Sequence, residues 1–289
     1  MKTENKLTIA SVAAAGVLFA ALGLDNKLTV ADYTVRSSKI KKPVSLVFLS
    51  DIHSQRYLDG GKELLSLIDS ANPDFVLFGG DVFDKYSLEK DIEKTVELVD
   101  KICENHDCSF VLGNHEIESK RRINYKKRLK EKNLRFFDGK SVELVSKSGQ
   151  HIIIGGVDYV DVQNDPALSA EKAAAEAKRE LIDKAEQTGL FSVLLRHVPM
   201  RTEGDEKIDL VLSGHNHGGL WRFPRTNAGI AGGGKKLLPE FAHGEYKKNG
   251  STMIVGSGIT THTYLLPRIY NAPEVVKVTL LPEIISKYR

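Results

Sequence analysis

The sequence predicts an α/β fold, because short apolar runs that are typical of strands alternate along the chain with helical segments. The chain has 289 residues, of which 41% are hydrophobic, and this is enough to bury one large core. Polar residues follow directly after the apolar runs, where open α/β sheets bind their ligands. These observations predict one functional domain in residues 26–289 and a separate N-terminal segment in residues 1–25.

Five apolar runs bounded by Gly or Pro are expected to form buried strands. They are Val44–Leu49, Phe75–Phe78, Phe110–Leu112, Phe191–Leu195 and Ile208–Leu212. Helices are expected at Gly61–Ser70 and Ser87–Asn105. A further surface helix is expected at Ala170–Ala185, where Ser169 can cap the start and Gly189 the end.

A short polar block follows each of the five runs. In chain order the blocks are Asp51-Ile52-His53, Gly80-Asp81-Val82-Phe83-Asp84, Gly113-Asn114-His115-Glu116, Arg196-His197-Val198-Pro199 and Gly214-His215-Asn216-His217-Gly218-Gly219. They supply carboxylate, imidazole and amide oxygen but no thiolate, which argues against a closed structural zinc site and favours Mn, Fe or Zn. Because the blocks offer about seven ligands, more than one ion needs, two divalent metal ions are expected.

The spacing in two of the blocks has a simple geometrical interpretation. Alternate residues of an extended segment point to the same side, so Asp51 with His53, and His215 with His217, are each expected to face one ion. Any one block alone is more often a turn or a surface pair. Five blocks in this order, each after a strand-like run, predict one shared site.

The ordered blocks resemble the calcineurin-like metallophosphoesterase family, whose pattern is Asp-x-His, Gly-Asp-x-x-Asp, Gly-Asn-His-Asp/Glu, a lone His and Gly-His-x-His. The resemblance covers Val44 to about Leu281, and Pro267-Arg268 resembles a small, often membrane-associated bacterial branch. It implies a four-layer α/β/β/α sandwich of two mixed sheets. The chain departs from the family at Asn216, where Thr is commoner, and at Leu220-Trp221. Both departures bear on which substrate the protein prefers.

The resemblance also assigns metal ligands. The first metal would be held by Asp51, His53 and His217. The second would be held by Asn114, His197 and His215, with Asp81 bridging both metals. The implied activity is hydrolysis of a phosphodiester or phosphomonoester by attack of a metal-bridging hydroxide.

Three further residues receive supporting roles from the same resemblance. His115 would donate a proton to the leaving group, and Asp84 and Glu116 would orient ligand histidines. The alternative function is a catalytically silent module that binds metal or phosphate. Such a module is expected to lack a ligand or His115, and the sequence lacks neither.

The N-terminal segment from Leu7 to Leu24 contains no charged residue and, at 18 residues, just suffices to cross a bilayer. A retained membrane anchor is expected; the alternative is a cleaved signal, with Ala21-x-Gly23 as a loose cleavage site, and a secreted enzyme. The basic residues after the segment favour a cytoplasmic domain. Long domains translocate regardless of such charges, and the similar branch is often exported, so the extracytoplasmic face is expected.

The segment from Lys120 to Arg135 carries nine basic residues against the single acidic Glu131. One interpretation is a solvated helix face. The other is a basic collar, including Arg121, Arg122 and Lys126, that attracts anionic headgroups and a lipid-linked or cell-envelope substrate.

Net charge and cysteine content complete the sequence analysis. The net charge of +3 is too mild to suggest a nucleic-acid partner. Cys103 and Cys108 are expected either to form a short disulfide or to pack as two small thiols.

Overall fold

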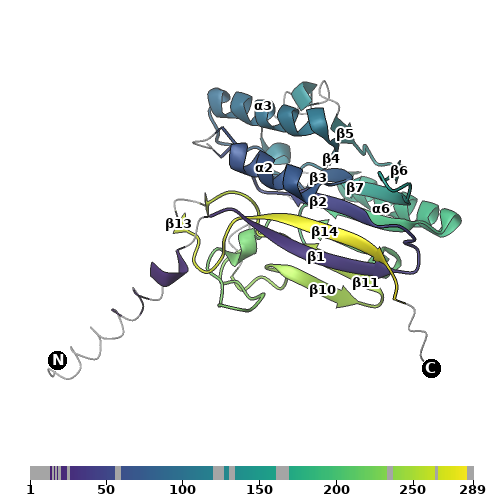
Figure 1. The fold of residues 1–289 in the computed structure, drawn as a ribbon. Coiled ribbons are helices and arrows are strands. Elements are labelled where there is room, and N and C mark those ends of the chain that lie inside the picture. Colours follow the sequence, from purple (N-terminus) through teal and green to yellow (C-terminus); the bar gives the residue numbers. More distant parts are fainter. Residues whose placement is uncertain are drawn as a thin grey trace.

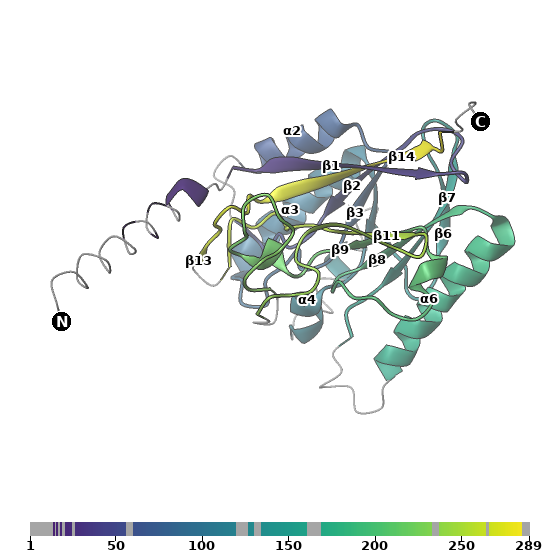
Figure 2. The same cartoon turned by 90° about the horizontal axis from the view of Figure 1, so that it is seen from below.

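The computed structural model describes residues 14, 16, 18, 21–24, 27–55, 60–119, 127–129, 134–160, 169–232, 237–263 and 266–284. Two six-stranded sheets pack face to face, and helices cover both outer faces (Figures 1 and 2). This is the α/β/β/α sandwich that the family resemblance implied, so the predicted fold class is confirmed.

The first sheet has the strand order β1-β14-β2-β3-β4-β5. These strands are β1 (Thr29–Ser37), β14 (Glu274–Pro282), β2 (Val44–Leu49), β3 (Phe75–Phe78), β4 (Asp107–Phe110) and β5 (Leu134–Phe136). From β2 to β5 the strands are parallel, whereas β14 is antiparallel to β2. The sheet is therefore mixed, and its parallel strands end at one common edge.

The second sheet has the strand order β10-β11-β9-β8-β7-β6. These strands are β10 (Gly244–Lys248), β11 (Ser251–Val255), β9 (Leu210–Ser213), β8 (Phe191–Arg196), β7 (His151–Val157) and β6 (Val142–Val145). The four central strands are parallel, and the two edge strands are antiparallel to their neighbours. A separate ribbon pairs β12 (His262–Thr263) with β13 (Leu266–Pro267).

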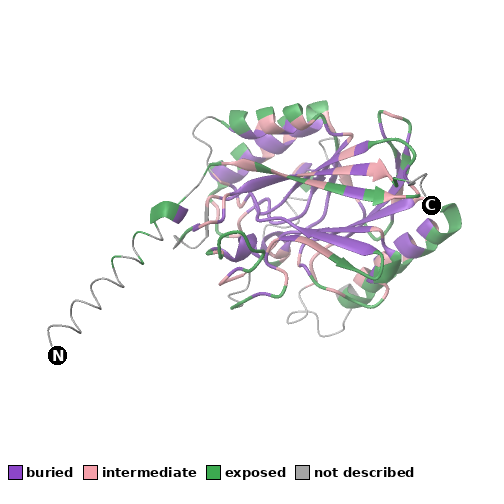
Figure 3. Cartoon of the chain, turned by 60° about the horizontal axis from the view of Figure 1, so that its bottom comes forward, coloured by how far each residue is buried: buried purple, intermediate pink, exposed green. Residues whose placement is uncertain are grey.

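The alternation of side chains along the strands separates three apolar layers. In β2, Val47 and Leu49 pack beneath α2 (Lys62–Ala71) and α3 (Glu89–Asn105), while Phe48 packs between the sheets. In the second sheet, Leu194 packs against Leu181 of α6 (Ser169–Thr188), on the opposite outer face. Figure 3 shows the resulting pattern, with buried strands inside and exposed outer faces on the helices.

All five predicted strands are present, but β8 ends one residue later than its run, at Arg196, and two other strands have shifted bounds. The run Phe110–Leu112 corresponds to β4, which ends at Phe110, and the run Ile208–Leu212 corresponds to β9, which begins at Leu210. The Leu112 N–H leaves the sheet pattern because it donates 2.8 Å to the side chain of Asp158. Seven further strands of the two sheets, β1, β5, β6, β7, β10, β11 and β14, were not predicted.

The three predicted helices are α2, α3 and α6. Gly189 ends α6 as expected: its φ is 69°, and its N–H donates 2.9 Å to the Ala185 carbonyl. The side chain of Ser169, the expected cap at the other end, lies outside the described residues.

Within the described residues, no helix is long and apolar enough to span a bilayer. Most of the predicted anchor from Leu7 to Leu24 lies outside those residues, so the domain boundary after residue 25 stays a prediction. The described residues 21–24 contact the domain, where the Tyr270 N–H donates 2.7 Å to the Gly23 carbonyl.

Arg121, Arg122 and Lys126 of the predicted basic collar also lie outside the described residues. Cys103 and Cys108 are both buried and free, so the thiols pack and do not form a disulfide. A hydrogen bond with Cys103, together with burial, raises the pKa of Cys108.

The contact between α6 and the second sheet gives a prediction for stability. Leu181 is 0% exposed, so Leu181→Ala is expected to lower the free energy of unfolding by about 2–5 kcal/mol through lost burial and a new cavity. Urea denaturation measures the change. Arg179→Ala on the exposed face of the same helix is the control, with an expected change within about 0.5 kcal/mol. Equal losses for the two variants would contradict this packing.

Candidate metal centre

The five polar blocks meet where the parallel strands of both sheets end. Asp51 and His53 follow β2, Asp81 follows β3, and Asn114 begins the short helix α4 (Asn114–Glu118) after β4. From the second sheet, His197 follows β8, and the segment of His215 and His217 follows β9. The predicted site at the strand ends is therefore assembled from both sheets.

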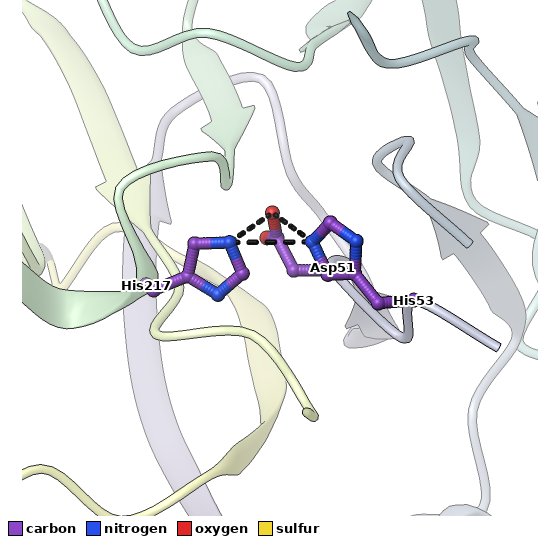
Figure 4. A group of neighbouring side chains, drawn as sticks. All are labelled: Asp51, His53 and His217. Carbon is purple, nitrogen blue, oxygen red and sulfur yellow. Dashed lines mark hydrogen bonds and ion pairs between the residues drawn. The ribbon is translucent and has the colours of Figure 1, made fainter. Parts of the chain in front are cut away.

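The first group of side chains contains Asp51, His53 and His217, whose ligand atoms all lie within 4.8 Å of one another. Nε2 of His53 lies 3.2 Å from Nε2 of His217. Asp51 Oδ1 lies 3.9 Å from the first of these nitrogens and 3.6 Å from the second. Figure 4 shows the two imidazole rings directed toward each other beside the Asp51 carboxylate.

The second group contains Asp81, His197 and His215, with the amide of Asn114 beside them. Nδ1 of His215 lies 3.2 Å from Nε2 of His197. Asn114 Oδ1 lies 2.9 Å from the first nitrogen and 3.1 Å from the second. Three nitrogen or amide-oxygen atoms therefore converge beside the Asp81 carboxylate.

The Asp81 carboxylate joins the two groups. Its Oδ2 lies 3.2 Å from His197 Nε2 in the second group and 3.8 Å from His53 Nε2 in the first. Its Oδ1 accepts the backbone N–H of His115 at 2.8 Å, which leaves Oδ2 directed between the groups. This is the position that a bridging ligand of two cations needs.

The donor set fits two divalent cations of the borderline class. It consists of two carboxylates, four imidazoles and one amide oxygen, and all seven side chains predicted from the sequence are present in it. His197 is held in the required tautomer, because its Nδ1–H donates 2.8 Å to the Gly79 carbonyl and leaves the Nε2 lone pair directed into the group. We conclude that these seven residues have the chemistry to hold two ions.

The conformation of the ligand segments differs from the expected extended one. Asp51, His53, Asp81, His215 and His217 all have positive φ, between 48° and 69°. The left-handed region costs about 1–3 kcal/mol for each such residue, although Asp and His adopt it more readily than most. The expected extended conformation was therefore wrong, and tight turns direct these side chains, although Asp51 and His53 do belong to one group as predicted.

The alternation also predicted that His215 and His217 face one ion together, and they do not. His217 belongs to the group of Asp51 and His53, whereas His215 belongs to the group of Asp81 and His197. A short turn, η2 (His217–Gly219), begins at His217, and both histidines have positive φ, so the extended conformation that the alternation assumed is absent here. The division agrees with the two ligand sets that the family resemblance assigned.

Two glycines allow the backbone to approach the carboxylates closely. A Cβ at Gly113 would lie 2.2 Å from Asp81 Oδ1, and one at Gly214 would lie 2.4 Å from Asp51 Oδ2. Real Cβ atoms do not approach other atoms so closely, and the neighbouring backbone leaves little room to shift. The Gly residues in these two blocks are therefore required by packing around the carboxylates.

Asp84 lies between two histidines. Its Oδ2 is 3.6 Å from Nδ1 of both His53 and His115, on the side away from the metal-facing nitrogen of His53. A carboxylate at this position orients an imidazole and makes its other nitrogen a better ligand. The arrangement supports the orienting role expected for Asp84.

Glu116 has a different role from the one expected. Its buried carboxylate accepts the backbone N–H groups of Asp81, Phe83 and Gly113 at 2.9, 2.9 and 2.8 Å. These three bonds fix the turn after β3 against the start of α4, so Glu116 positions the Asp81 backbone and does not orient a histidine. Burial and the nearby Asp81 charge raise the pKa of Glu116 to about 7.

His115 lies at the edge of the centre, with Nε2 4.0 Å from Asp81 Oδ2. In the neutral form, Nδ1 of His115 accepts a hydrogen bond from the Lys85 backbone N–H, with 3.3 Å between the two nitrogens. Nδ1 also faces the Asp84 carboxylate, which stabilises the charged form of the imidazole. Burial lowers the pKa of His115, but Asp84 and Asp81 outweigh it and raise the pKa above its ordinary value. The two carboxylates therefore favour the protonated form of His115.

The side chains of the centre shift one another's pKa values. Burial would raise the pKa of Asp81, but His197, His53 and His115 hold it well below its usual range. Burial lowers the pKa of His197, yet the Asp81 carboxylate raises it to about 10. Burial and His197 lower the pKa of His215 to about 4. A proton and a divalent ion therefore compete for Nε2 of His197, so acid opposes metal binding.

Two buried residues that sequence reasoning did not assign to the site support the turn of His217. Asn271 Nδ2 donates to the His217 carbonyl at 2.7 Å and to the Leu220 carbonyl at 3.1 Å. Arg268, which is 0% exposed, donates 2.7 Å to the Ser257 carbonyl beside the same turn. An arginine in the apolar stretch before Ile269 was the only sequence signal, and it did not specify a partner.

Comparison with known proteins gives an independent result. The family model for calcineurin-like phosphoesterases matches residues 44–219, more than half of the chain and all five blocks. The uncharacterized protein YpbG of Bacillus subtilis is 29% identical over 230 residues, which cover 77% of this chain and 80% of YpbG. An uncharacterized metallophosphoesterase of Aquifex aeolicus is 26% identical over 269 residues, with 88% and 92% covered.

Two other similar proteins differ more in extent or sequence. An uncharacterized metallophosphoesterase of Helicobacter pylori strain J99 is 26% identical over 250 residues, which cover 85% of this chain but 62% of that protein. The solved structure of a dimetal phosphatase from Danio rerio has a TM-score of 0.46 and 10% identity, and the match covers 74% of this chain and 87% of that one.

The position of Asp81 between the groups gives a prediction. Asp81→Asn replaces the central charge with a neutral amide, so both groups are expected to lose metal and hydrolysis is expected to fall by at least about 100-fold, more than outer partners of metal ligands contribute. Elemental analysis of the purified protein measures the metal content, and a phosphoesterase assay measures the rate of hydrolysis. Asp69→Asn, at an exposed carboxylate of α2, is the control. Retention of two metals by Asp81→Asn would refute the bridging assignment.

Proposed function

Because this chain belongs to the calcineurin-like phosphoesterase family and is a metal-dependent phosphoesterase, we propose that it hydrolyses a phosphodiester or phosphomonoester at the centre around Asp81. One observation carries the proposal: Asp81 Oδ2 faces His53 and His197 together and so joins two sets of ligands. A catalytically silent module would be expected to lack a ligand or His115, and this chain has them all.

The residues of the centre divide the work of holding the cations and the substrate. Asp51, His53 and His217 would hold one divalent ion, Mn, Fe or Zn, and Asn114, His197 and His215 would hold the other. When bound, the two ions supply positive charge for the phosphate and lower the pKa of a water molecule, which provides the nucleophile. With only the carboxylates of Asp51 and Asp81 among the ligands, the loaded centre keeps a net positive charge that attracts a phosphoester.

His115 is the proposed proton donor to the leaving oxygen. Its Nε2 is directed toward the centre, while the opposite ring nitrogen faces Asp84. Asp84 and Asp81 raise the pKa of His115, which favours the protonated imidazole that a proton donor requires. His115 is not among the seven ligands, and its loss therefore leaves the ligand set complete.

The proposed acid role predicts a substrate-dependent loss. His115→Ala is expected to keep both metals and to slow hydrolysis of an alkyl phosphodiester by about 10²–10⁴-fold. The loss is expected to be much smaller for a p-nitrophenyl ester, because that leaving group needs no proton. Steady-state kinetics on the two esters, with metal content measured in parallel, provide the test.

The control is His151→Ala, which removes an exposed imidazole that pairs with Glu143. His151 lies at the start of β7, whereas the centre lies where the parallel strands end. It is expected to leave both rates unchanged. Equal losses on the activated and unactivated esters for His115→Ala would exclude the role as a general acid.

For the substrate, the proposal is a phosphoester linked to a lipid or to a cell-envelope precursor, at the extracytoplasmic face of a membrane. Two sequence features support it: the uncharged segment Leu7–Leu24 and the basic collar in Lys120–Arg135. The first can anchor the enzyme, and each basic residue near an anionic leaflet contributes about 1 kcal/mol of attraction. A cleaved signal and a secreted enzyme remain the alternative.

The membrane proposal predicts a difference between substrates. Deletion of residues 1–20, which keeps Gly23 and its contact with Tyr270, is expected to preserve hydrolysis of a small soluble diester. Hydrolysis of a phosphoester embedded in anionic vesicles is expected to fall. Charge reversal at Arg121, Arg122 and Lys126 should lower vesicle activity further, and more at low salt than at high salt.

A matched control reverses three exposed basic residues elsewhere, Lys140, Lys172 and Arg179. The control has the same net charge as the collar variant and is expected to keep more of the vesicle activity. Full vesicle activity at low salt after both the deletion and the collar reversal would remove the basis for the collar as a lipid-binding element.

A further inference from the structure

Six large apolar side chains are exposed on three segments beside the metal centre, with exposed fractions between 40% and 74%. This apolar rim consists of Leu22, Leu24, Trp221, Phe223, Leu237 and Leu238. Soluble surfaces seldom gather so many large apolar groups on adjoining segments without a partner.

Backbone contacts show that the three segments adjoin. The Tyr270 N–H donates to Gly23, and the neighbouring Ile269 pairs with Trp221. The Ile230 N–H donates 2.8 Å to the Trp221 carbonyl and the Leu238 N–H donates 2.9 Å to the Ile230 carbonyl. Figures 1 and 2 both place residues 21–24 beside β13, at the same end of the molecule.

The rim also borders the metal centre. Trp221 lies four residues after His217, which the structure places in the first ligand group. The N–H groups of Ile230 and Ala231 donate 3.2 and 3.0 Å to the Gly219 carbonyl, at the end of the His217 turn. A partner on the rim would therefore lie next to the centre.

The chemistry of Trp221 indicates the type of partner. Its indole N–H donates 3.1 Å to the Pro267 carbonyl, so the ring has no unsatisfied polar atom to oppose transfer into an apolar medium. Tryptophan favours the interface between water and lipid for the same reason, with an apolar body and one satisfied polar group.

The chain itself indicates which apolar medium the rim meets. The uncharged segment Leu7–Leu24 runs directly into the rim through Leu22 and Leu24, which belong to both. A bilayer that holds this segment lies at the rim, because Gly23 is hydrogen-bonded to the folded domain.

We propose that the apolar rim inserts into the interfacial layer of a lipid bilayer and presents the metal centre to phosphoesters at the headgroup level. The inference rests on the proposed function and names the surface through which the membrane substrate would be reached. It makes the rim, in addition to the N-terminal segment, a lipid contact.

The chain contains a single tryptophan, Trp221, so its fluorescence reports on the rim without any substitution. The full-length protein is reconstituted into vesicles of phosphatidylcholine and phosphatidylglycerol that carry brominated acyl chains. We expect a blue shift of the emission, and stronger quenching by bromine near the carbonyl end of the chains than near the methyl end. Quenching no stronger than in vesicles of the same lipids without bromine would overturn the proposal.

Substitutions test the energetic contribution of the rim. Phe223→Ser with Leu238→Ser is expected to lower hydrolysis of a vesicle-embedded phosphoester by about tenfold or more, since two large apolar groups no longer leave water. Hydrolysis of a small soluble diester is expected to stay unchanged. Val145→Ser with Ile284→Ser, at comparably exposed apolar residues of other segments, is the matched control. Equal losses for the two double variants would contradict a specific rim.

Two further outcomes distinguish failure of the rim from failure of the metal centre, and a bilayer from a protein partner. If the soluble diester is hydrolysed but Trp221 is not quenched, the rim is refuted while the proposed function stands; if neither diester nor vesicle substrate is hydrolysed, the proposed function itself fails. A blue shift that depends on protein concentration in the absence of lipid would identify a second copy of the chain as the occupant and overturn the bilayer.

Discussion

The position of the Asp81 carboxylate is the constraint on which the centre depends. One oxygen accepts the His115 N–H, and the other faces His197 and His53 from two ligand groups. Three backbone bonds to Glu116 hold the turn that carries it. A buried charge is costly unless it is paired and hydrogen-bonded, so the turns that supply the partners of Asp81 must keep their positions.

The two sheets supply the rigidity that such a centre needs. Five ligand residues have positive φ, which together costs several kcal/mol at about 1–3 kcal/mol each. The apolar layer between the sheets, with Phe48 from one and Leu195 from the other, holds the strand ends against each other and offsets this strain. The packed sheets therefore hold the turns at their strand ends in place, so that ligands from both sheets can converge.

Function at a membrane would place two further demands on the same end of the molecule. A phosphoester at a bilayer surface must reach the metals, while its apolar portion stays out of water. The apolar rim borders the His217 turn, and residues 21–24 adjoin it. Chemistry and lipid contact would then lie side by side, with the chain's uncharged N-terminal segment entering at the same place.

The sequence by itself determined the α/β fold class and the five polar blocks, because apolar runs and ligand-type side chains are local features, and the resemblance to a known family named the seven candidate ligands within those blocks. The alternation of residues alone predicted one shared ion for His215 and His217; the tertiary structure places them in different groups, as the family resemblance had assigned. It also decided the role of Glu116 and the support from Arg268 and Asn271, since a hydrogen-bond partner distant in sequence leaves no periodic signal. The same reason explains unpredicted strands such as β1 and β14, which are defined by the neighbours with which they pair, because those neighbours lie far away in the sequence.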